Sequence, residues 1–492
     1  MALKEEAVLT VDTMNSNVKE MQYAVRGPIV GLAAEVESEL ENGQDKPFKE
    51  VVRANIGDCH ATGQHPLTFL RQVLALTVYP DLFKDPNFPE DAKLRANLVL
   101  DSCKGRSVGS YSESSGLKNV RKHIAEFIER RDGYQADMNH VFTSTGASEG
   151  IKTILHLLNC DIDGKKPGVM IPIPQYPLYS ATLVEYAMPQ IQYYLDEENH
   201  WSLDMAEMQR AIDEARSTCN PRAVVVINPG NPTGQVLSRQ NIESIIKFAH
   251  KERLVILADE VYQHNVYDPA CEFHSFKKVL TEMGPEISAN VQLASFMSIS
   301  KGYMGECGLR AGYFEVVNFD EKLLMQLNKC ISVKLCPPVT GQAALECVVN
   351  PPREGEPSYE LHEKEKAEVL DGLKAKAKLV SSTFNAIDGI SCNNIQGAMY
   401  CFPQVQIPKK AIEYTQSNLY KVGVDEIKIT PDEFYCFELL KKTGLCVVPG
   451  SGFKQREGTY HFRCTILPEK EKFDVVMEKF KKFHTEFLAE WQ

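Results

Sequence analysis

Three residue types in two short segments of this chain could together carry out amine chemistry. Lys301, in Ser298-Ile299-Ser300-Lys301-Gly302, supplies an amine that can form an imine with an aldehyde. Upstream, the run Ile256-Leu257-Ala258-Asp259-Glu260-Val261-Tyr262 adds a carboxylate and a phenol. Pyridoxal phosphate chemistry needs these three groups: a lysine for the covalent link, an acid for the ring nitrogen and a donor beside the ring oxygen.

Further candidate residues follow apolar runs, where buried strands are expected to end. Asn231 lies in the turn that follows residues 223–227, and Ala147 and Ser148 follow Phe142. In open α/β sheets, ligands bind beyond the carboxyl ends of the strands. The small residues near Ala147 could hold a phosphate or could simply begin a capped helix. Asp259 at a buried strand end needs a partner, either an arginine or a helix cap within the protein or a protonated ring nitrogen.

Two arginines complete the candidate set. Arg310 closely follows Lys301, and arginine is the usual residue for fork-like binding of a phosphate. Arg463 lies within the apolar run Tyr460-His461-Phe462-Arg463-Cys464-Thr465, away from its ends. An arginine in such a position indicates a ligand that is a carboxylate.

The elements that must position these residues follow an α/β pattern. Short apolar runs at 169–171, 223–227, 254–257 and 291–294 alternate with helical segments, and a helix is predicted near 117–128 with Ser114 or Ser115 as its cap. Continuous apolar runs suit strands covered on both faces, which predicts a mostly parallel, doubly wound sheet. We expect residues 1–65 to form an N-terminal arm and part of a small domain, residues 66–350 a large domain, and residues 351–492 a small α+β domain that includes a long helix near 358–384.

Net charge, cysteine spacing and the lack of long apolar runs exclude several classes of protein. The 492 residues are 43% hydrophobic and carry a net charge of −12, so nucleic acid and anionic membranes are not expected partners. Fourteen cysteines show no C-x-x-C pair, and no metal site is expected. With no signal-like N-terminus and no long apolar span, we expect a soluble, cytoplasmic protein.

These motifs occur in the order found in fold-type I aminotransferases, which the chain resembles. The matching elements are Asn231-Pro232-Thr233-Gly234, Asp259-x-x-Tyr262, Ser298-x-x-Lys301, Arg310 and Arg463. Within that group, the segments 55–58, 109–112, 300–308 and 448–453 look like the alanine aminotransferases. The N-terminal arm looks most like that of the plant members. One departure is Cys59, where many relatives carry proline.

The resemblance implies a role for each matching residue. Lys301, Asp259 and Tyr262 would be catalytic. The implied cofactor-binding set is Lys301, Asp259, Tyr262, Asn231, Tyr176, Ala147, Ser148, Ser298, Arg310 and Tyr111, with Tyr111 reaching the cofactor of a neighbouring subunit in a homodimer. The implied substrate-binding set is Arg463 for the α-carboxylate, the Gly57 backbone, Asn231 and Tyr176. Lys301 would act as a neutral amine, which burial beside a cationic ring would favour by lowering its pKa.

The activity implied is reversible, ping-pong amino transfer between L-alanine and 2-oxoglutarate, giving pyruvate and L-glutamate. A glutamate–glyoxylate aminotransferase is the alternative, although the C-terminus lacks a peroxisomal tripeptide. A non-catalytic binding or regulatory module is the non-enzymatic alternative, which the presence of Lys301, Asp259 and Arg463 disfavours. A Rossmann oxidoreductase is excluded because no G-x-G-x-x-G follows the first strand.

Overall fold

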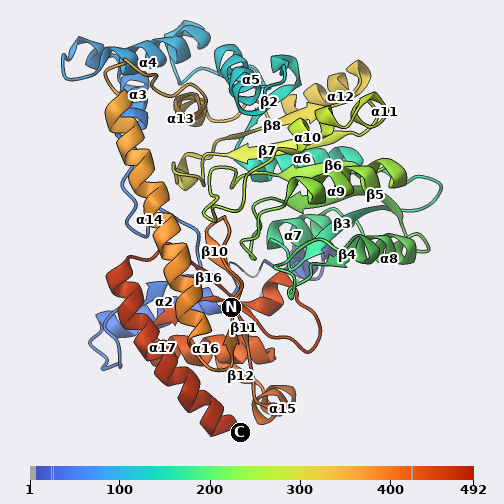
Figure 1. Cartoon of the computed structure of the whole chain (residues 1–492), viewed down its shortest axis with the longest axis vertical. Coiled ribbons are helices and arrows are strands. Elements are labelled where there is room, and N and C mark those ends of the chain that lie inside the picture. Colours follow the sequence, from blue (N-terminus) through green and yellow to red (C-terminus); the bar gives the residue numbers. More distant parts are fainter. Residues whose placement is uncertain (1–6, 24, 26, 423–424) are drawn as a thin grey trace.

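A seven-stranded sheet forms the centre of the molecule. The computed structural model describes residues 7–23, 25, 27–422 and 425–492. In spatial order the strands are β2 (Val141–Ser144), β8 (Gly312–Val317), β7 (Leu293–Ser298), β6 (Val255–Asp259), β5 (Asn220–Ile227), β3 (Pro167–Ile173) and β4 (Gln190–Tyr194). Neighbours from β7 to β4 pair in parallel, whereas β8 runs antiparallel to both β2 and β7. The expected mostly parallel, doubly wound α/β sheet is confirmed (Figure 1).

Helices cover both faces of this sheet, which explains its continuous apolar strands. One face packs against α6 (Ala147–Leu158), α7 (Pro177–Glu185) and α12 (Glu321–Ser332). The other packs against α8 (Met205–Ala215), α9 (Arg239–Glu252), α10 (Phe276–Glu282) and α11 (Pro285–Ser288). Val225 and Leu257 point to the first layer, and Val224 and Ile256 to the second, as the two-residue period of a strand requires.

A helical layer lies beyond the β2 edge of the sheet. It contains α3 (Thr68–Val78), α4 (Glu90–Ser102), α5 (Lys118–Asp132) and α13 (Val339–Val349), joined by the 3-10 turns Pro80–Lys84 and Lys104–Arg106. The prediction that Ser114 or Ser115 caps the third of these helices was wrong, because Leu117 is its N-cap residue. Gly116 has φ +110°, a left-handed backbone that breaks any earlier helical start, and the Ser115 carbonyl instead accepts the Thr143 N–H.

The C-terminal part of the chain builds small sheets below the central one. The strands β10 (Tyr400–Cys401), β16 (Phe462–Thr465) and β15 (Val448–Pro449) form an antiparallel sheet, and β9 (Ile390–Ser391) pairs with β11 (Gln404–Val405). The strand pair β12 (Tyr420–Val422) and β13 (Asp425–Ile427) is separate, and β1 (Val52–Arg53) pairs with β14 (Leu445–Cys446). The surrounding helices are α2 (Pro28–Glu41), α15 (Lys409–Ser417), α16 (Pro431–Thr443) and α17 (Lys470–Trp491).

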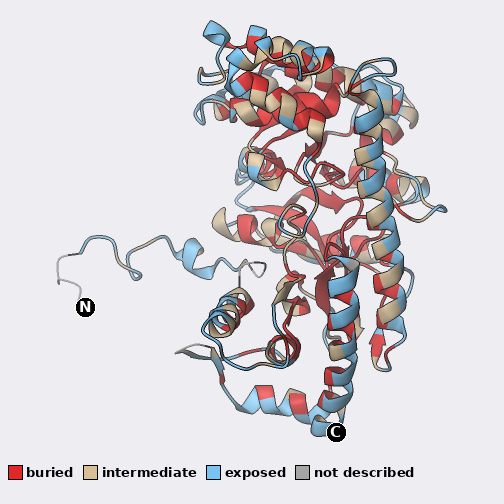
Figure 2. Ribbon diagram, turned by 90° about the vertical axis from the view of Figure 1, so that its left-hand side faces the viewer, coloured by how far each residue is buried: buried red, intermediate tan, exposed pale blue. Residues whose placement is uncertain are grey.

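One long helix joins the two parts, and a short segment projects from them. The helix α14 (Tyr359–Asn385) runs along the side of the molecule from the helical layer to the C-terminal sheets (Figure 1). It confirms the helix predicted near 358–384. At the N-terminus, α1 (Ser16–Glu20) has no buried residue and lies against α7, where the Asn17 side chain donates to the Glu185 carbonyl. The segment before α1 projects away from the body (Figure 2). Among the described residues, no helix is long and apolar enough to cross a membrane.

Candidate active site

A cavity of about 590 Å³ lies between the carboxyl ends of the central strands and the C-terminal sheet. Its lining includes Lys301, Asp259, Tyr262, Asn231, Tyr176, Ala147, Ser148, Ser298, Arg310, Arg463 and Gly57. The structure therefore brings eleven of the twelve predicted site residues into one place. The twelfth, Tyr111, does not line this cavity, and 69% of its surface is exposed. Eight of these residues lie at or just after the carboxyl end of a central strand, where the ligands of open α/β sheets bind. Arg310 instead lies just before β8, which runs antiparallel to β7 and begins at the same edge.

Asp259 ends β6 as a buried carboxylate with one satisfied oxygen. The Tyr179 hydroxyl donates to Oδ2 at 2.9 Å, whereas Oδ1 has no hydrogen-bond partner among the described residues. Burial raises the pKa of Asp259 to about 6, against the Tyr179 hydrogen bond, which lowers it. Because Asp259 lines the cavity, its unpartnered Oδ1 could accept a hydrogen bond from a ligand, for example from a protonated ring nitrogen.

Lys301 follows β7 and reaches across to the N-terminal segment. Its Nζ donates to the Gly57 carbonyl oxygen at 2.5 Å. Burial favours a lower pKa for this amine, but the Tyr400 phenol and the thiols of Cys307 and Cys59 outweigh burial and raise it. Burial thus acts in the expected direction, but the phenol and thiols, which sequence reasoning did not place beside this amine, outweigh it. The expected effect of a cationic ring on Lys301 stays a prediction.

The start of α6 forms a cradle with Arg310. Gly146, the N-cap residue, has φ +74°, and a Cβ added there would lie 2.5 Å from the Arg310 guanidinium. Arg310 donates to the Thr145 carbonyl at 3.1 Å and to Ser148 Oγ at 3.3 Å. A helix N-terminus with a hydroxyl and an arginine favours an anionic group such as a phosphate. The alternative of a mere capped helix start does not explain why Arg310 lies here. Ser298, at the end of β7, donates its hydroxyl to the Ala311 carbonyl nearby.

Arg463 lies on β16 with 1% of its surface exposed. Its guanidinium donates to Asn231 Oδ1 at 3.2 Å and to the Asn55 carbonyl at 2.6 Å. The Nε atom has no partner among the described residues. A buried cation that is held by neutral oxygens, with no carboxylate partner in the described part of the chain, is suited to pairing with the carboxylate of a ligand.

Four tyrosines also line this cavity, in two hydrogen-bonded pairs. The Tyr262 hydroxyl donates to the Tyr400 hydroxyl at 3.3 Å, and the Tyr176 hydroxyl is 2.8 Å from that of Tyr23. Sequence reasoning missed Tyr400, Tyr179 and Tyr23. Tyr179 lies three residues after Tyr176 on one helix, so helical spacing could have pointed to it. No sequence signal marks Tyr400, because it reaches the site only through the pairing of β10 with β16.

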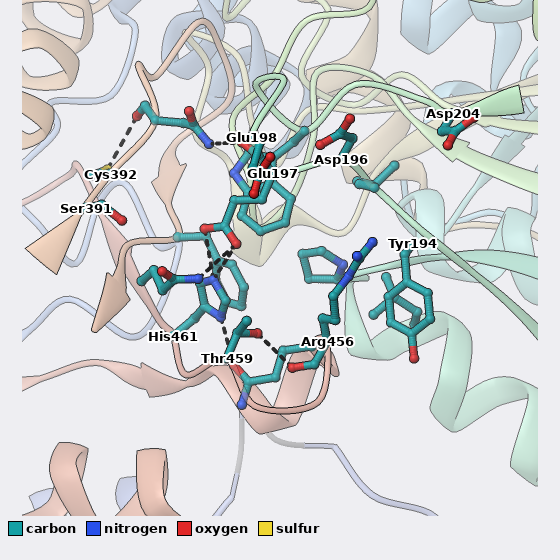
Figure 3. Close-up of a pocket in the computed structure, with 18 of the residues that line it drawn as sticks. Tyr194, Asp196, Glu197, Glu198, Asp204, Ser391, Cys392, Arg456, Thr459 and His461 are labelled. Atoms are coloured by element: carbon teal, nitrogen blue, oxygen red, sulfur yellow. Dashed lines mark hydrogen bonds and ion pairs between the residues drawn. The ribbon is translucent and has the colours of Figure 1, made fainter. Parts of the chain in front are cut away.

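A second cavity, of about 720 Å³, lies where the loop after β4 meets the C-terminal sheets (Figure 3). Three of its acidic side chains already have partners within the protein. Both oxygens of Glu197 lie 3.0 Å from His461 Nε2, Glu207 pairs with Arg210, and the Asp204 side chain caps α8. None of the described residues that line it is a predicted site residue. The candidate active site is therefore the first cavity.

Comparison with known proteins identifies the family. Residues 74–480 match the family model described as aminotransferase class I and II. The chain belongs to this family. It is 57% identical to human alanine aminotransferase 1 over 98% of this chain and 96% of the relative. It is 45% identical to glutamate–glyoxylate aminotransferase 1 of Arabidopsis thaliana over the whole of this chain and 98% of that protein.

Solved structures support the fold of this family member. An alanine aminotransferase from Pyrococcus furiosus superposes with a TM-score of 0.73, covering 96% of this chain and all of the other at 22% identity. An aminotransferase from Escherichia coli gives the same TM-score and identity. The fold-type I architecture is therefore confirmed.

The aminotransferases of this family use pyridoxal phosphate, and the site fits that cofactor. The unpartnered Oδ1 of Asp259 matches its ring nitrogen, and the cradle of Ser148 and Arg310 matches its phosphate. Lys301 lines the same cavity. The protein is thus a pyridoxal-phosphate-dependent aminotransferase.

Proposed function

We propose that this aminotransferase exchanges the amino group between L-alanine and 2-oxoglutarate, giving pyruvate and L-glutamate reversibly. The observation that carries the proposal is the single buried arginine fork at the substrate end of the cavity. Arg463 suits one carboxylate, and the other arginine among the described lining residues, Arg310, is engaged at the α6 cradle. A site with one arginine for one carboxylate suits a substrate with a small neutral side chain, such as the methyl group of alanine. The similarity to human alanine aminotransferase 1 also supports the proposed activity.

The protein's own groups divide the chemistry among them. When bound, the cofactor supplies an aldehyde that links to amines and a ring that accepts electron density from the substrate α-carbon. We propose that Asp259 keeps the ring nitrogen protonated, while Tyr262 and Asn231 donate to the ring oxygen and Tyr176 covers the ring face. Ala147, Ser148, Ser298 and Arg310 would hold the phosphate. Lys301 would hold the covalent link, then move the α-proton once the substrate amine has displaced it. Arg463 and the Gly57 backbone would orient the substrate carboxylate.

Arg463→Lys is expected to raise the Michaelis constants for alanine and glutamate alike by about tenfold to a hundredfold. Lysine keeps the charge but loses the planar fork, and hydrogen bonds to charged groups are typically worth about 1.5–3 kcal/mol. Steady-state kinetics with each substrate will measure the change. An effect confined to glutamate would mean that Arg463 binds the distal carboxylate instead.

Aspartate is expected to be a poor substrate. The distal carboxylate of glutamate would be met by neutral donors, water or a mobile side chain, because a permanently buried second cation would be left unpaired when alanine binds. The shorter aspartate side chain would not reach those donors. The measurement compares kcat/KM for alanine, glutamate and aspartate at one fixed keto acid. Aspartate matching glutamate would contradict both the pocket argument and the alanine assignment.

The alternative activity is glutamate–glyoxylate amino transfer, which the 45% identity to the Arabidopsis thaliana protein favours. A panel of amino acid and keto acid pairs with purified protein separates the two. Alanine with 2-oxoglutarate should give the highest kcat/KM. A clear preference for glyoxylate as the acceptor would replace the proposal with this alternative.

We further propose a homodimer in which Tyr111 contributes to the neighbouring subunit's site. Tyr111 is a large, exposed aromatic residue, and Arg310 at the α6 cradle is itself exposed, so a second chain could close this edge. Exposed Met325, Val333 and Leu335 near the end of α12 add apolar surface for such a contact. Sedimentation should give about twice the chain mass of 55.3 kDa. Mixing inactive Tyr111→Ala and Lys301→Ala chains should restore part of the activity, and no recovery would argue against a shared site.

We also propose the domain division 1–65, 66–350 and 351–492, and a cytoplasmic location. The pairing of β1 with β14 supports assigning part of the N-terminal segment to the small domain. The large domain would hold the sheet and the α3–α5 layer. All fourteen cysteines are free thiols in the described residues, which suits a reducing compartment. Fractionation of cells that express the full chain tests the location.

A further inference from the structure

Tyr400 contacts three of the residues that the proposed mechanism uses. It lies on β10 with 3% of its surface exposed. Its hydroxyl accepts a hydrogen bond from Tyr262 at 3.3 Å and also interacts with the Lys301 amine. The Arg463 guanidinium carbon lies 4.4 Å from the centre of the Tyr400 ring, a cation–π contact. One side chain thus touches the lysine, the ring-oxygen donor and the proposed carboxylate ligand.

Gly57 leaves the space in which the Tyr400 hydroxyl and the Lys301 amine lie together. A Cβ built on Gly57 would lie 2.1 Å from the Tyr400 oxygen and 2.9 Å from Lys301 Nζ. Any side chain at residue 57 would therefore displace the phenol or the amine. The Gly57 carbonyl also accepts the Lys301 hydrogen bond, so the glycine both leaves space for the pair and anchors the amine.

The pKa values of Tyr400 and Tyr262 shift in opposite directions, in agreement with the direction of the hydrogen bond between them. Burial raises the pKa of Tyr400, but the positive charges of Lys301 and Arg463 outweigh burial and bring it below its usual value. For Tyr262, burial and the neighbouring Tyr400 raise the pKa well above its usual value. Tyr262 therefore keeps its proton and donates it in the hydrogen bond, and Tyr400 is the phenol of the pair that more readily ionises.

We propose that Tyr400 is a further catalytic residue of the amino transfer: its hydroxyl holds the Lys301 amine and exchanges a proton with it. The proposal rests on the function proposed above for Lys301. Tyr400 is the main group that favours the charged form of Lys301, and it is also the group that can take the proton from it. That transfer leaves the neutral amine that must accept the α-proton.

The proton exchange balances without an external acid or base. An N–H bond of the Lys301 ammonium breaks as an O–H bond forms on the Tyr400 phenolate. The charged pair becomes a neutral amine and a neutral phenol, and the net charge of the pair stays the same. The reverse transfer restores the charged lysine. The Tyr262 hydrogen bond and the Arg463 charge stabilise the phenolate between these events.

The test is Tyr400→Phe in the full-length chain, because phenylalanine keeps the ring beside Arg463 and removes only the hydroxyl. In the loaded enzyme, kcat for alanine should fall by about 10²-fold, within the range for proton-transfer groups, while KM changes by less than about threefold. In the same chain after cofactor removal, the pH dependence of Lys301 acetylation by acetic anhydride is measured by peptide mass spectrometry, with exposed Lys364 as the internal reference. Loss of the phenol should move the Lys301 midpoint down by at least about one pH unit.

Tyr193→Phe is the matched control. Tyr193 is also buried, and its hydroxyl donates to the Val225 carbonyl at 2.8 Å, but it does not line the cavity. This variant should leave both kcat and the Lys301 midpoint unchanged. An unchanged midpoint in Tyr400→Phe, or an equal shift in Tyr193→Phe, would overturn the proposal. The acetylation result does not depend on which amino acid is transferred, so failure of alanine as a substrate would reject the proposed function separately.

Discussion

Lys301→Ala is expected to bind the cofactor without a covalent link and to lose at least about 10³-fold in turnover, the middle of the range for general acid–base groups. The reason is that one amine would both hold the covalent link and move the α-proton, so its loss removes both functions at once. The structure supports this assignment. The Lys301 side chain lines the cavity, and its amine donates to the Gly57 carbonyl on the opposite wall.

Two measurements check the assignment of Lys301. In the parent protein, borohydride should attach the cofactor irreversibly to the peptide that contains Lys301. Replacement of Lys364, an exposed lysine on α14, serves as the control and should leave activity unchanged. Activity of the Lys301→Ala variant within tenfold of the parent, or a cofactor label on another lysine, would refute the site.

Asp259→Asn is expected to retain the fold and lose at least about 10²-fold in kcat. An amide cannot balance the positive charge of a ring nitrogen, and electrostatic groups of this kind typically contribute about 3 kcal/mol to the transition state. Asp259 lines the cavity where such a charge would lie, and its Oδ1 has no hydrogen-bond partner among the described residues. A loss of less than threefold would show that Asp259 does not face the ring.

The same substitution should not destabilise the cofactor-free chain. The pKa of Asp259 is raised to about 6, above the unfolded value of about 3.9, so the fold binds this proton more tightly than the unfolded chain does. The stability of the parent chain therefore falls as the pH rises from about 4 to about 6, and the full cost of up to about 3 kcal/mol persists above that window. Asn avoids that cost. Denaturant unfolding at pH 7 will compare the free energy of unfolding of the cofactor-free parent with that of cofactor-free Asp259→Asn. A strong loss of stability in the variant would mean that Asp259 has a structural role instead.

The order and type of the main strands and helices could be predicted from the sequence. The strand that ends at Asp259 and the strand before Asn228 each contain a continuous apolar run. Such runs are typical of strands in a sheet that is covered on both faces. Because parallel strands end at one edge, residues that follow them were expected to meet, and Lys301, Asp259, Asn231 and Ser148 do. The start of α5 was misplaced because the left-handed backbone at Gly116, which breaks the earlier start, is set by its surroundings.

What only the tertiary structure decided is which groups surround the amine of Lys301. The sequence determined the chemistry of the single residues: an amine, a carboxylate, two arginines and their positions at strand ends or within an apolar run. Tyr400 is 99 residues from Lys301 in the chain and reaches it because β10 pairs with β16, which places the phenol beside Arg463. Pairing between distant strands depends on the packing of the whole molecule and leaves no local pattern. The pKa directions of Lys301 and Tyr400 arise from that pairing, because the charge of a buried group depends on neighbours that only the folded chain brings within a few ångströms.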